Sequence, residues 1–370
     1  MEYKAFKDVK LSRLGLGNMR LPSDKDAEGK VHINHEKAWE LIDLAYEKGI
    51  TYFDTAYVYN AGDSEVTVGE AMSKHDRNTF YIATKFNVNA NPDYEAVFKQ
   101  ELERLQTDHI DFYLIHCLMD SNIDKYIESG AIEYFKKMKE EGKITYLGFS
   151  SHASVETLKR FADYTDWDFA QLQINYFDWM YGTSKAEYEI LTERNIPVMV
   201  MEPVRGGKLS SLTPETDAIL KERHPEWSIS SWALRFVKTL PNVQVILSGM
   251  STLSQVNDNI ETFSNDESLC DEDMKLLMEV CEKFKKQIQV PCTGCRYCTD
   301  DCPAEINIPE FLNLYNQYKV DGASVLKKAE KIETTGTPKD CVGCGACTAN
   351  CPQNIDTPKI MEELKGLLDK

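Results

Sequence analysis

Cysteine is almost absent from the first 269 residues of this 370-residue chain, where only Cys117 occurs. The chain also has no run of 18 apolar residues, whereas a helix that spans a membrane needs about 20. The segment Met1–Lys7 lacks the apolar core of a signal peptide. These absences argue against a membrane protein and against a secreted domain held together by disulfides. We therefore expect a cytoplasmic protein.

Basic residues are in deficit, because 42 Lys and Arg stand against 60 Asp and Glu and give a net charge of -18. A strongly acidic chain is repelled by nucleic-acid phosphates and by anionic membrane surfaces. We therefore expect no nucleic-acid partner and no membrane partner. Hydrophobic residues make up 42% of the chain, which is enough for a full core. The length leaves room for one large domain and a smaller one.

Apolar segments alternate with amphipathic ones over the first two thirds of the chain. Eight apolar segments are predicted strands: 14–19, 52–56, 80–86, 110–116, 145–150, 169–175, 197–202 and 243–249. Eight near-continuous apolar strands, each followed by a helix, indicate a parallel sheet buried on both faces. Such a sheet closes into a (β/α)8 TIM barrel. An open doubly wound sheet is the alternative, although the turn Gly15–Arg20 lacks the third glycine of a dinucleotide fingerprint.

Four polar residues stand at or just after the ends of predicted strands. Asp54, Lys85 and His116 each end a strand, and Tyr59 lies in the loop after Asp54. The chemistry of a barrel sits at the carboxyl ends of its strands. A phenol has a pKa of about 10, and a neighbouring ammonium lowers it. Each residue alone would be no evidence of a function. The four together indicate a tyrosine whose pKa is tuned so that it exchanges a proton with a carbonyl compound.

Three segments resemble signatures of the aldo-keto reductase family: Asp54–Tyr59, Ala83–Lys85 and Asp108–His116. The resemblance implies a (β/α)8 barrel with a nicotinamide cofactor, NADP or NAD, at its mouth. By position, Tyr59 would be the general acid/base, Lys85 and Asp54 would tune it, and His116 would position the substrate. The implied reaction is hydride transfer between nicotinamide and the carbonyl carbon of an aldehyde, ketone or quinone.

The same resemblance implies a set of cofactor contacts. They are Ser150, Ser151 and Gln171 for the carboxamide, Met201 for the nicotinamide ring, Pro203 and Gly207 for the pyrophosphate, and Ser248, Gly249, Met250, Gln255, Asp258 and Asn259 for the adenosine end. Gly249 and Gln255 stand where NADP-preferring members often carry Lys and Arg for the 2'-phosphate. Because phosphate recognition depends on charge-assisted hydrogen bonds, we predict dual or NADH preference unless Arg205 or Lys208 supplies the charge.

Eight cysteines after Pro291 form two runs with the same spacing, each followed by a proline. Both runs resemble the bacterial ferredoxin pattern, in which the fourth cysteine binds the other cluster. The resemblance implies two [4Fe-4S] clusters, one held by Cys292, Cys295, Cys298 and Cys351 and the other by Cys302, Cys341, Cys344 and Cys347. Glycines within the runs, such as Gly294, Gly343 and Gly345, would let the backbone approach. A pair of zinc sites is the alternative, although zinc usually takes two separated pairs of ligands.

The expected domains are an aldo-keto reductase barrel over residues 1–270 and a mostly helical ferredoxin-like domain over residues 271–370. Two functions remain open. The first is a carbonyl reductase dependent on NAD(P)H, with an appended iron-sulfur domain whose clusters are structural or pass electrons to an external redox partner. The second is an electron-transfer or redox-sensing iron-sulfur protein whose barrel is mainly a binding scaffold.

Overall fold

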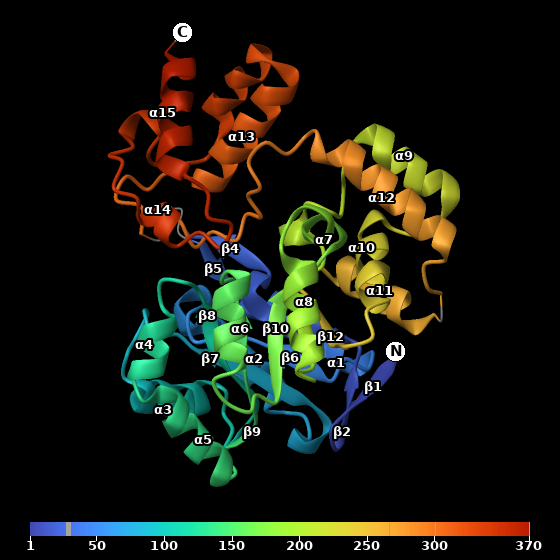
Figure 1. The fold of residues 1–370 in the computed structure, drawn as a ribbon, viewed down its shortest axis with the longest axis vertical. Helices are drawn as coiled ribbons and strands as arrows, with labels where there is room; N and C mark the ends of the chain where they lie inside the picture. Colours follow the sequence, from blue (N-terminus) through green and yellow to red (C-terminus); the bar gives the residue numbers. More distant parts are fainter. Residues whose placement is uncertain (27–30, 266, 300, 370) are drawn as a thin grey trace. The chain divides into compact units, whose positions relative to one another are not determined.

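The structure is a computed structural model that describes residues 1–26, 31–265, 267–299 and 301–369 (Figure 1). The chain forms two compact units. The first contains Met1–Val204 and Ser231–Cys270, and the second contains Arg205–Ser230 and Asp271–Lys370. The division into domains 1–270 and 271–370 stays a prediction, and the segment Arg205–Ser230 packs within the second unit.

Eight parallel strands close a barrel in the first unit, so the predicted (β/α)8 fold is confirmed and the open sheet is excluded. The strands are β3 (Leu14–Gly17), β6 (Tyr52–Asp54), β7 (Tyr81–Phe86), β8 (Ile110–Leu118), β9 (Ile144–Ser151), β10 (Phe169–Gln173), β11 (Val198–Met201) and β12 (Val243–Ser248). They pair in the ring order β10-β11-β12-β3-β6-β7-β8-β9. Every residue of β6 and β10 is buried, as expected for strands with a filled interior and a helical cover.

Helices follow the strands of this unit and surround the barrel in Figure 1. They are α1 (His35–Glu47), α2 (Asp63–Met72), α3 (Tyr94–Arg104), α4 (Ile123–Glu128), α5 (Ala131–Glu140), α6 (Val155–Ala162), α7 (Tyr176–Tyr181), α8 (Ser184–Glu193), α10 (Ile229–Lys238) and α11 (Leu253–Ser264). Side-chain caps fix several starts. Asn34 accepts from the Lys37 amide at α1, and Ser154 accepts from the Thr157 amide at α6, which satisfies donors that the first turn leaves open.

Two hairpins accompany the barrel. One joins β1 (Tyr3–Phe6) to β2 (Val9–Ser12), and the other joins β4 (Ser23–Lys25) to β5 (Val31–Ile33). Phe6 of the first hairpin packs edge-on against Tyr146, near the start of β9, with ring centroids 5.1 Å apart. The hairpin therefore covers the amino-terminal end of the strands, opposite the end where barrel chemistry sits.

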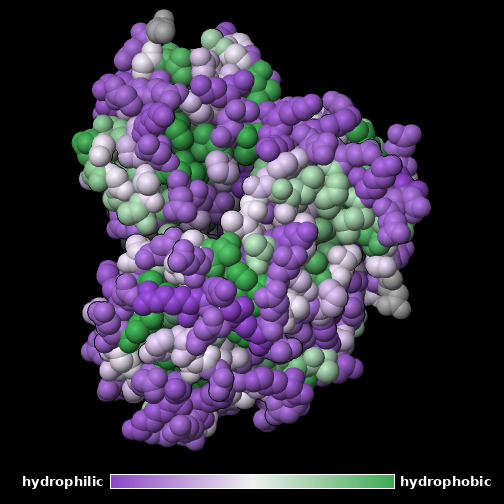
Figure 2. Space-filling view, in the orientation of Figure 1, coloured by the Kyte–Doolittle hydropathy of each residue, from purple (hydrophilic) through white to green (hydrophobic). Residues whose placement is uncertain are grey.

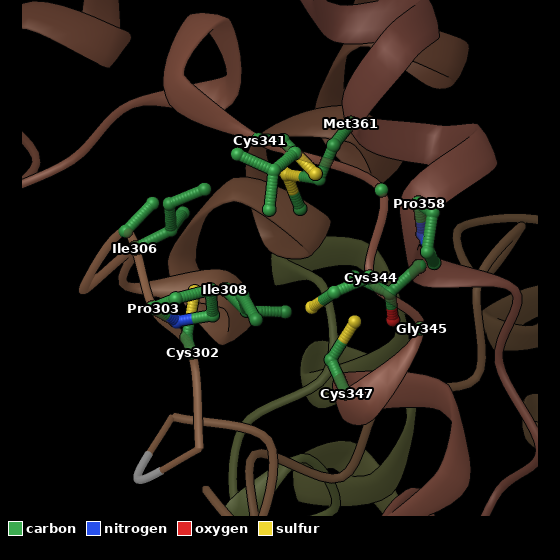
Figure 3. Close-up of a pocket in the computed structure, with 14 residues that line it drawn as sticks. Cys302, Pro303, Ile306, Ile308, Cys341, Cys344, Gly345, Cys347, Pro358 and Met361 are labelled. Carbon is green, nitrogen blue, oxygen red and sulfur yellow. The ribbon is translucent and has the colours of Figure 1, made fainter.

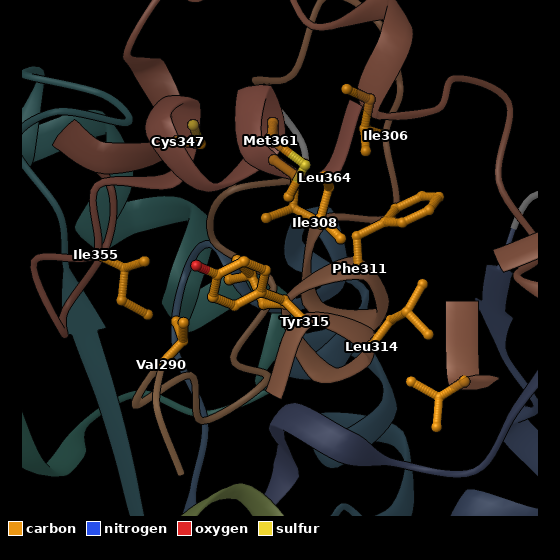
Figure 4. Close-up of a cluster of buried hydrophobic side chains, with 12 residues drawn as sticks. Val290, Ile306, Ile308, Phe311, Leu314, Tyr315, Cys347, Ile355, Met361 and Leu364 are labelled. Atoms are coloured by element: carbon orange, nitrogen blue, oxygen red, sulfur yellow. The ribbon is translucent and has the colours of Figure 1, made fainter. Parts of the chain in front are cut away.

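The second unit is mostly helical, as predicted. Its elements are α9 (Pro214–Arg223), α12 (Asp271–Lys285), α13 (Ile308–Asp321), α14 (Ala346–Ala349), α15 (Thr357–Leu368) and the 3₁₀ turns Arg205–Gly207, Ala323–Lys331 and Pro338–Asp340. Figure 4 shows the hydrophobic core that α13 and α15 share, with Phe311 and Tyr315 beside Met361 and Leu364. Several cysteines pack against this core, so both cysteine runs take part in the packing of this unit.

The face of the molecule seen in Figure 2 is mostly hydrophilic, with small apolar patches between the polar residues. This agrees with the large excess of acidic side chains. Among the helices in the described ranges, none combines the length and the apolar character that crossing a membrane requires.

Candidate active site and cysteine pockets

Four side chains singled out by the sequence analysis lie together at the carboxyl ends of neighbouring strands. Asp54 ends β6, Lys85 and His116 lie near the ends of β7 and β8, and Tyr59 begins the 3₁₀ helix after β6. Lys85 Nζ donates to Asp54 Oδ1 over 2.6 Å and to the backbone carbonyl of Thr55. It lies 4.8 Å from the centroid of the Tyr59 ring, and the Tyr59 and His116 ring centroids are 5.8 Å apart. Their catalytic roles stay predictions.

Lys85 and Asp54 form an ion pair that is almost wholly buried, with exposed fractions of 0% and 3%. Burial lowers the pKa of Lys85, but the Asp54 carboxylate and the Tyr59 phenol outweigh this and raise the pKa above its ordinary value. Burial raises the pKa of Asp54, and the charge of Lys85 opposes that rise. The ammonium therefore persists at neutral pH beside Tyr59, which is what a proton-donating tyrosine requires.

A β-bulge in β8 directs His116. The register between β8 and β9 shifts between Ile115 and Leu118, and Cys117 takes a left-handed φ of 55°. The Cys117 amide donates to Ser150 Oγ over 2.8 Å, which holds the bulge against β9. Bulges commonly re-aim a side chain beside an active site. The predicted carboxamide contact Ser150 thus also supports the histidine.

His116 is a neutral imidazole. Burial, the charge of Lys85 and the neighbouring His152 hold its pKa well below the ordinary value. Its Nδ1 has no hydrogen-bond partner among the described residues, and the same is true of the buried Asp54 Oδ2 and Gln171 Oε1. Buried polar atoms without a partner are costly. These three atoms are therefore candidates for hydrogen bonds to a polar ligand.

A layer of buried polar residues behind β7 was missed by the sequence reasoning. Glu65 accepts from Thr84 Oγ1 over 2.5 Å and from Arg104 Nη1 over 3.0 Å. Glu101 accepts from the Tyr113 hydroxyl over 2.6 Å. Burial raises the pKa of both carboxyl groups, and the Glu65 charge raises that of Glu101 further. Each of these residues stands alone in an ordinary helix or strand, so no local pattern reveals the layer.

The predicted cofactor contacts of the first unit lie at strand ends and on α11, where some of them bind one another. Asn259 Nδ2 donates to Ser248 Oγ over 2.9 Å, and Gln171 Nε2 approaches Met201 Sδ at 3.5 Å. Gln255 Oε1 accepts from the Ser251 amide over 2.7 Å. Of the others, Ser150 and Ser151 end β9, Pro203 follows β11, Gly249 and Met250 follow β12, Asp258 lies on α11, and Gly207 belongs to the second unit.

Arg20 is a cation near the predicted adenosine contacts that the sequence reasoning passed over. A methyl group at Gly249 would lie 3.8 Å from both Cβ and Cδ of Arg20. The Ser251 hydroxyl donates to the Arg20 backbone carbonyl over 2.6 Å. The contact follows from barrel closure, because β12 pairs with β3, the strand before Arg20. Arg20 and Gly249 are far apart in the sequence, so no local motif reveals their contact.

Two pockets of the second unit are each lined by four cysteines. The first cysteine pocket has Cys292, Cys295, Cys298 and Cys351, and the second cysteine pocket has Cys302, Cys341, Cys344 and Cys347. Figure 3 shows the sulfur atoms of Cys344 and Cys347 directed into the second pocket. The fourth cysteine of each run thus lines the pocket of the other run. This grouping is the ligand set that the ferredoxin resemblance implies.

The chemistry of the pockets suits iron-sulfur clusters. Gly294, Gly343 and Gly345 have left-handed φ angles of 68°, 70° and 78°, and a Cβ on any of them would meet no described atom within 4 Å. The backbone therefore curves around open space. Burial and the neighbouring cysteines raise the pKa of Cys298 to about 12. Thiolates gather in such a place only around a positively charged centre, and the four thiolates around a [4Fe-4S] cluster meet this condition.

Comparisons with known proteins agree with both parts of the chain. Residues 13–282 match the aldo/keto reductase family, and residues 291–355 match the 4Fe-4S dicluster domain. The uncharacterized oxidoreductase YqkF of Bacillus subtilis is 28% identical over 304 residues, which are 73% of this chain and 92% of that protein. The NADH-specific methylglyoxal reductase of Escherichia coli is 23% identical over 330 residues, which are 75% of this chain and 97% of that protein.

A solved structure is similar as well. The holo form of the aldo-keto reductase AKR11C1 from Bacillus halodurans is 27% identical, with a TM-score of 0.63, over 76% of this chain and 96% of that chain. The family match spans well over half of the sequence, from the strand before Arg20 to the helix α12. The chain therefore belongs to the aldo/keto reductase family of NAD(P)H-dependent oxidoreductases and carries a C-terminal 4Fe-4S dicluster domain.

Proposed function

We propose that this protein reduces a small carbonyl compound, an aldehyde, ketone or quinone, with NAD(P)H as hydride donor and Tyr59 as general acid. One observation carries the proposal. The buried Lys85 ammonium lies between Asp54, at 2.6 Å, and the Tyr59 ring, whose centroid is 4.8 Å away. This places a fixed positive charge beside a phenol at the carboxyl end of the barrel, where the phenolate formed by proton donation is stabilised.

The residues act on the substrate oxygen while the bound nicotinamide supplies the hydride to the carbonyl carbon. Tyr59 donates its hydroxyl proton to that oxygen, so the carbonyl becomes an alcohol. Lys85 stabilises the resulting phenolate, and Asp54 keeps the lysine charged and oriented. The neutral His116 donates a hydrogen bond that positions the carbonyl without adding a charge. Run in reverse, the same groups oxidise an alcohol.

We propose NADH or dual cofactor preference. Gly249 and Gln255 carry no charge for a 2'-phosphate, and Gln255 Oε1 is engaged by the Ser251 amide. The name of the Escherichia coli relative, an NADH-specific methylglyoxal reductase, points the same way. Where NADPH is accepted, we assign the contact with the 2'-phosphate to Arg20, whose side chain lies beside Gly249. Comparable kcat/KM for both cofactors, or a higher value with NADH, supports this preference, and strong NADPH selectivity refutes it.

The decisive experiment is Tyr59→Phe with NAD(P)H oxidation measured against methylglyoxal, other aldehydes and quinones. Loss of the proton donor should lower kcat by about 10²–10⁴-fold, while cofactor binding, followed by protein fluorescence, remains. Tyr57→Phe is the matched control, because Tyr57 is a half-buried tyrosine whose hydroxyl donates to Gln100 over 3.2 Å. It should keep wild-type turnover.

Turnover in Tyr59→Phe equal to that of the wild type would contradict the general-acid role. Absence of turnover in the wild type with every substrate, together with loaded clusters, would favour the other function. In that case the protein is an electron-transfer or redox-sensing iron-sulfur protein whose barrel serves as a scaffold.

We further propose that the two cysteine pockets hold two [4Fe-4S] clusters, each of which exchanges one electron with an external redox partner. The grouping of eight cysteines into two sets of four supports this. Anaerobically purified protein should contain about eight iron and eight sulfide atoms per chain. Electron paramagnetic resonance before and after NADH addition then tests whether hydride electrons reach the clusters. Zinc without inorganic sulfide would contradict the assignment.

A further inference from the structure

Arg205, in the loop after β11, is fixed beside the first cysteine pocket. Its side chain is 1% exposed, and Nη2 donates to the Pro291 carbonyl over 3.0 Å, one residue before Cys292. The backbone takes a left-handed φ of 50°, which is disfavoured for a residue with a Cβ. Such a conformation persists only where the surroundings hold it. The surrounding structure therefore holds Arg205 in a strained backbone conformation, with its guanidinium buried beside the residue that precedes Cys292.

Lys208, three residues further on, is bound to α13 (Ile308–Asp321), a helix that lines the same pocket. Its Nζ donates to Asn313 Oδ1 over 3.3 Å, and the preceding residue, Leu312, lines the first cysteine pocket. The chain that leads into Cys292 is itself fixed on α13, because Asn316 Oδ1 accepts from the Val290 amide over 2.7 Å. All these residues belong to the second unit, so both cations are held in a defined place relative to the pocket.

Both cations are therefore held beside the first cysteine pocket. Arg205 is bound to the residue before Cys292, and Lys208 is bound to α13, whose Leu312 lines the pocket. A fixed positive charge beside a pocket favours any negative charge that is added there. Its effect is large because the surroundings are of low dielectric.

We propose that Arg205 and Lys208 are positioning residues that raise the reduction potential of the cluster in the first cysteine pocket. The inference rests on the proposed iron-sulfur centre. Reduction of a [4Fe-4S] cluster adds one electron and breaks no bond, so the centre becomes more negative by one charge. Nearby charge, hydrogen bonds and burial set such potentials. These cations, which the sequence analysis considered for the cofactor phosphate, therefore serve the cluster.

The test is a redox titration of the anaerobic full-length protein with dithionite, followed by electron paramagnetic resonance. The variants are Lys208→Gln, Arg205→Gln and Arg205→Lys, and Lys328→Gln, an exposed lysine of the same unit, is the control. Lys208→Gln and Arg205→Gln should each disfavour reduction of one cluster by about tenfold, which is a fall of about 59 mV for a one-electron couple. The other cluster should keep its potential. Arg205→Lys, which keeps the charge, should lie close to the wild type.

Iron and sulfide counts on each variant separate this inference from the function on which it rests. Wild-type protein without clusters overturns the iron-sulfur assignment and the tuning role together. Loaded variants in which both cluster potentials stay unchanged overturn the tuning role alone. A fall of both potentials by the same amount, with an equal fall in the control Lys328→Gln, also overturns it. Unchanged cluster potentials with a raised KM for NADPH would show instead that Arg205 and Lys208 bind the phosphate of the cofactor. If Arg205→Gln does not fold, the half-buried Lys208 decides the result.

Discussion

Glu101 is a carboxyl group for which ionisation is costly. Burial and the charge of Glu65 place its pKa well above the ordinary value, so the folded protein holds a proton that the unfolded chain releases above a pH of about 4.3. The folded state therefore binds more protons than the unfolded state in this range. Its contribution to stability is fully present below that pH and is lost as the pH rises through the folded pKa.

Glu101→Gln should remove this dependence, because an amide has the same shape and does not ionise. Relative to the wild type, the variant should gain about 1.4 kcal/mol in the free energy of unfolding per pH unit within the window. Urea denaturation at several pH values measures the difference. Glu103→Gln, on the exposed side of α3, is the control and should follow the wild type. A constant difference between Glu101→Gln and the wild type would show that Glu101 is ionised.

Among single residues, the four predicted active-site residues could be found from the sequence, but their neighbours could not. Asp54, Lys85 and His116 could be found because equivalent strand ends of a barrel meet in space, and the placing of Tyr59 followed from the loop after Asp54. Glu101 and Arg20 could not be found, because their surroundings are made by tertiary contacts between elements distant in the chain. No period or motif marks a single buried acid.

The loop that carries Tyr59 is a strained element. Asn60 and Ala61 both take left-handed φ angles, 50° and 54°, before Gly62 opens α2. Asparagine tolerates this conformation, but alanine is disfavoured in it by about 1–2 kcal/mol. Strain of this kind is common beside functional sites, and here it fixes the point at which the chain turns away from the phenol.

Ala61→Gly should raise the free energy of unfolding by about 0.5–1 kcal/mol. Glycine relieves the backbone strain, but its greater conformational freedom in the unfolded chain offsets part of that stabilisation. Chemical denaturation measures it. Ala186→Gly, at an exposed position of the helix α8, provides the opposite case and should lose about 1 kcal/mol. Destabilisation by both substitutions would contradict the strain.

Regular elements were predictable, and the irregular joints between them were not. The eight strands of the barrel follow from near-continuous apolar runs, and the observed strand ranges differ from the predicted ones by a few residues at their ends. The bulge at Cys117 and the left-handed turn at Asn60 leave no such signature, because both are imposed by the fit of neighbouring strands and helices. They are also the joints that aim His116 and Tyr59.

For the whole molecule, the second unit should depend on its metal. Its core is small, and five cysteines, Cys292, Cys298, Cys302, Cys341 and Cys351, pack against it half-buried. Removing iron with a chelator under oxidising conditions should lower the melting temperature of this unit and expose it to proteases. The barrel, with its own core, should melt as before. Calorimetry of loaded and stripped protein measures both transitions, and reconstitution with iron and sulfide should restore the first.

An unchanged melting profile after complete loss of iron would contradict this dependence and would make the helical core self-sufficient. Simultaneous loss of both transitions would instead show that the units unfold cooperatively. Metal binding is itself part of the folding free energy of such a unit.

Each cysteine run lends its last member to the opposite pocket, Cys302 to one and Cys351 to the other. Loss of the last cysteine of one run would therefore remove a lining residue from the pocket of the other run. If the two pockets hold the proposed clusters, assembly of one would depend on a ligand from the run that forms the other, and we expect the two to be loaded together.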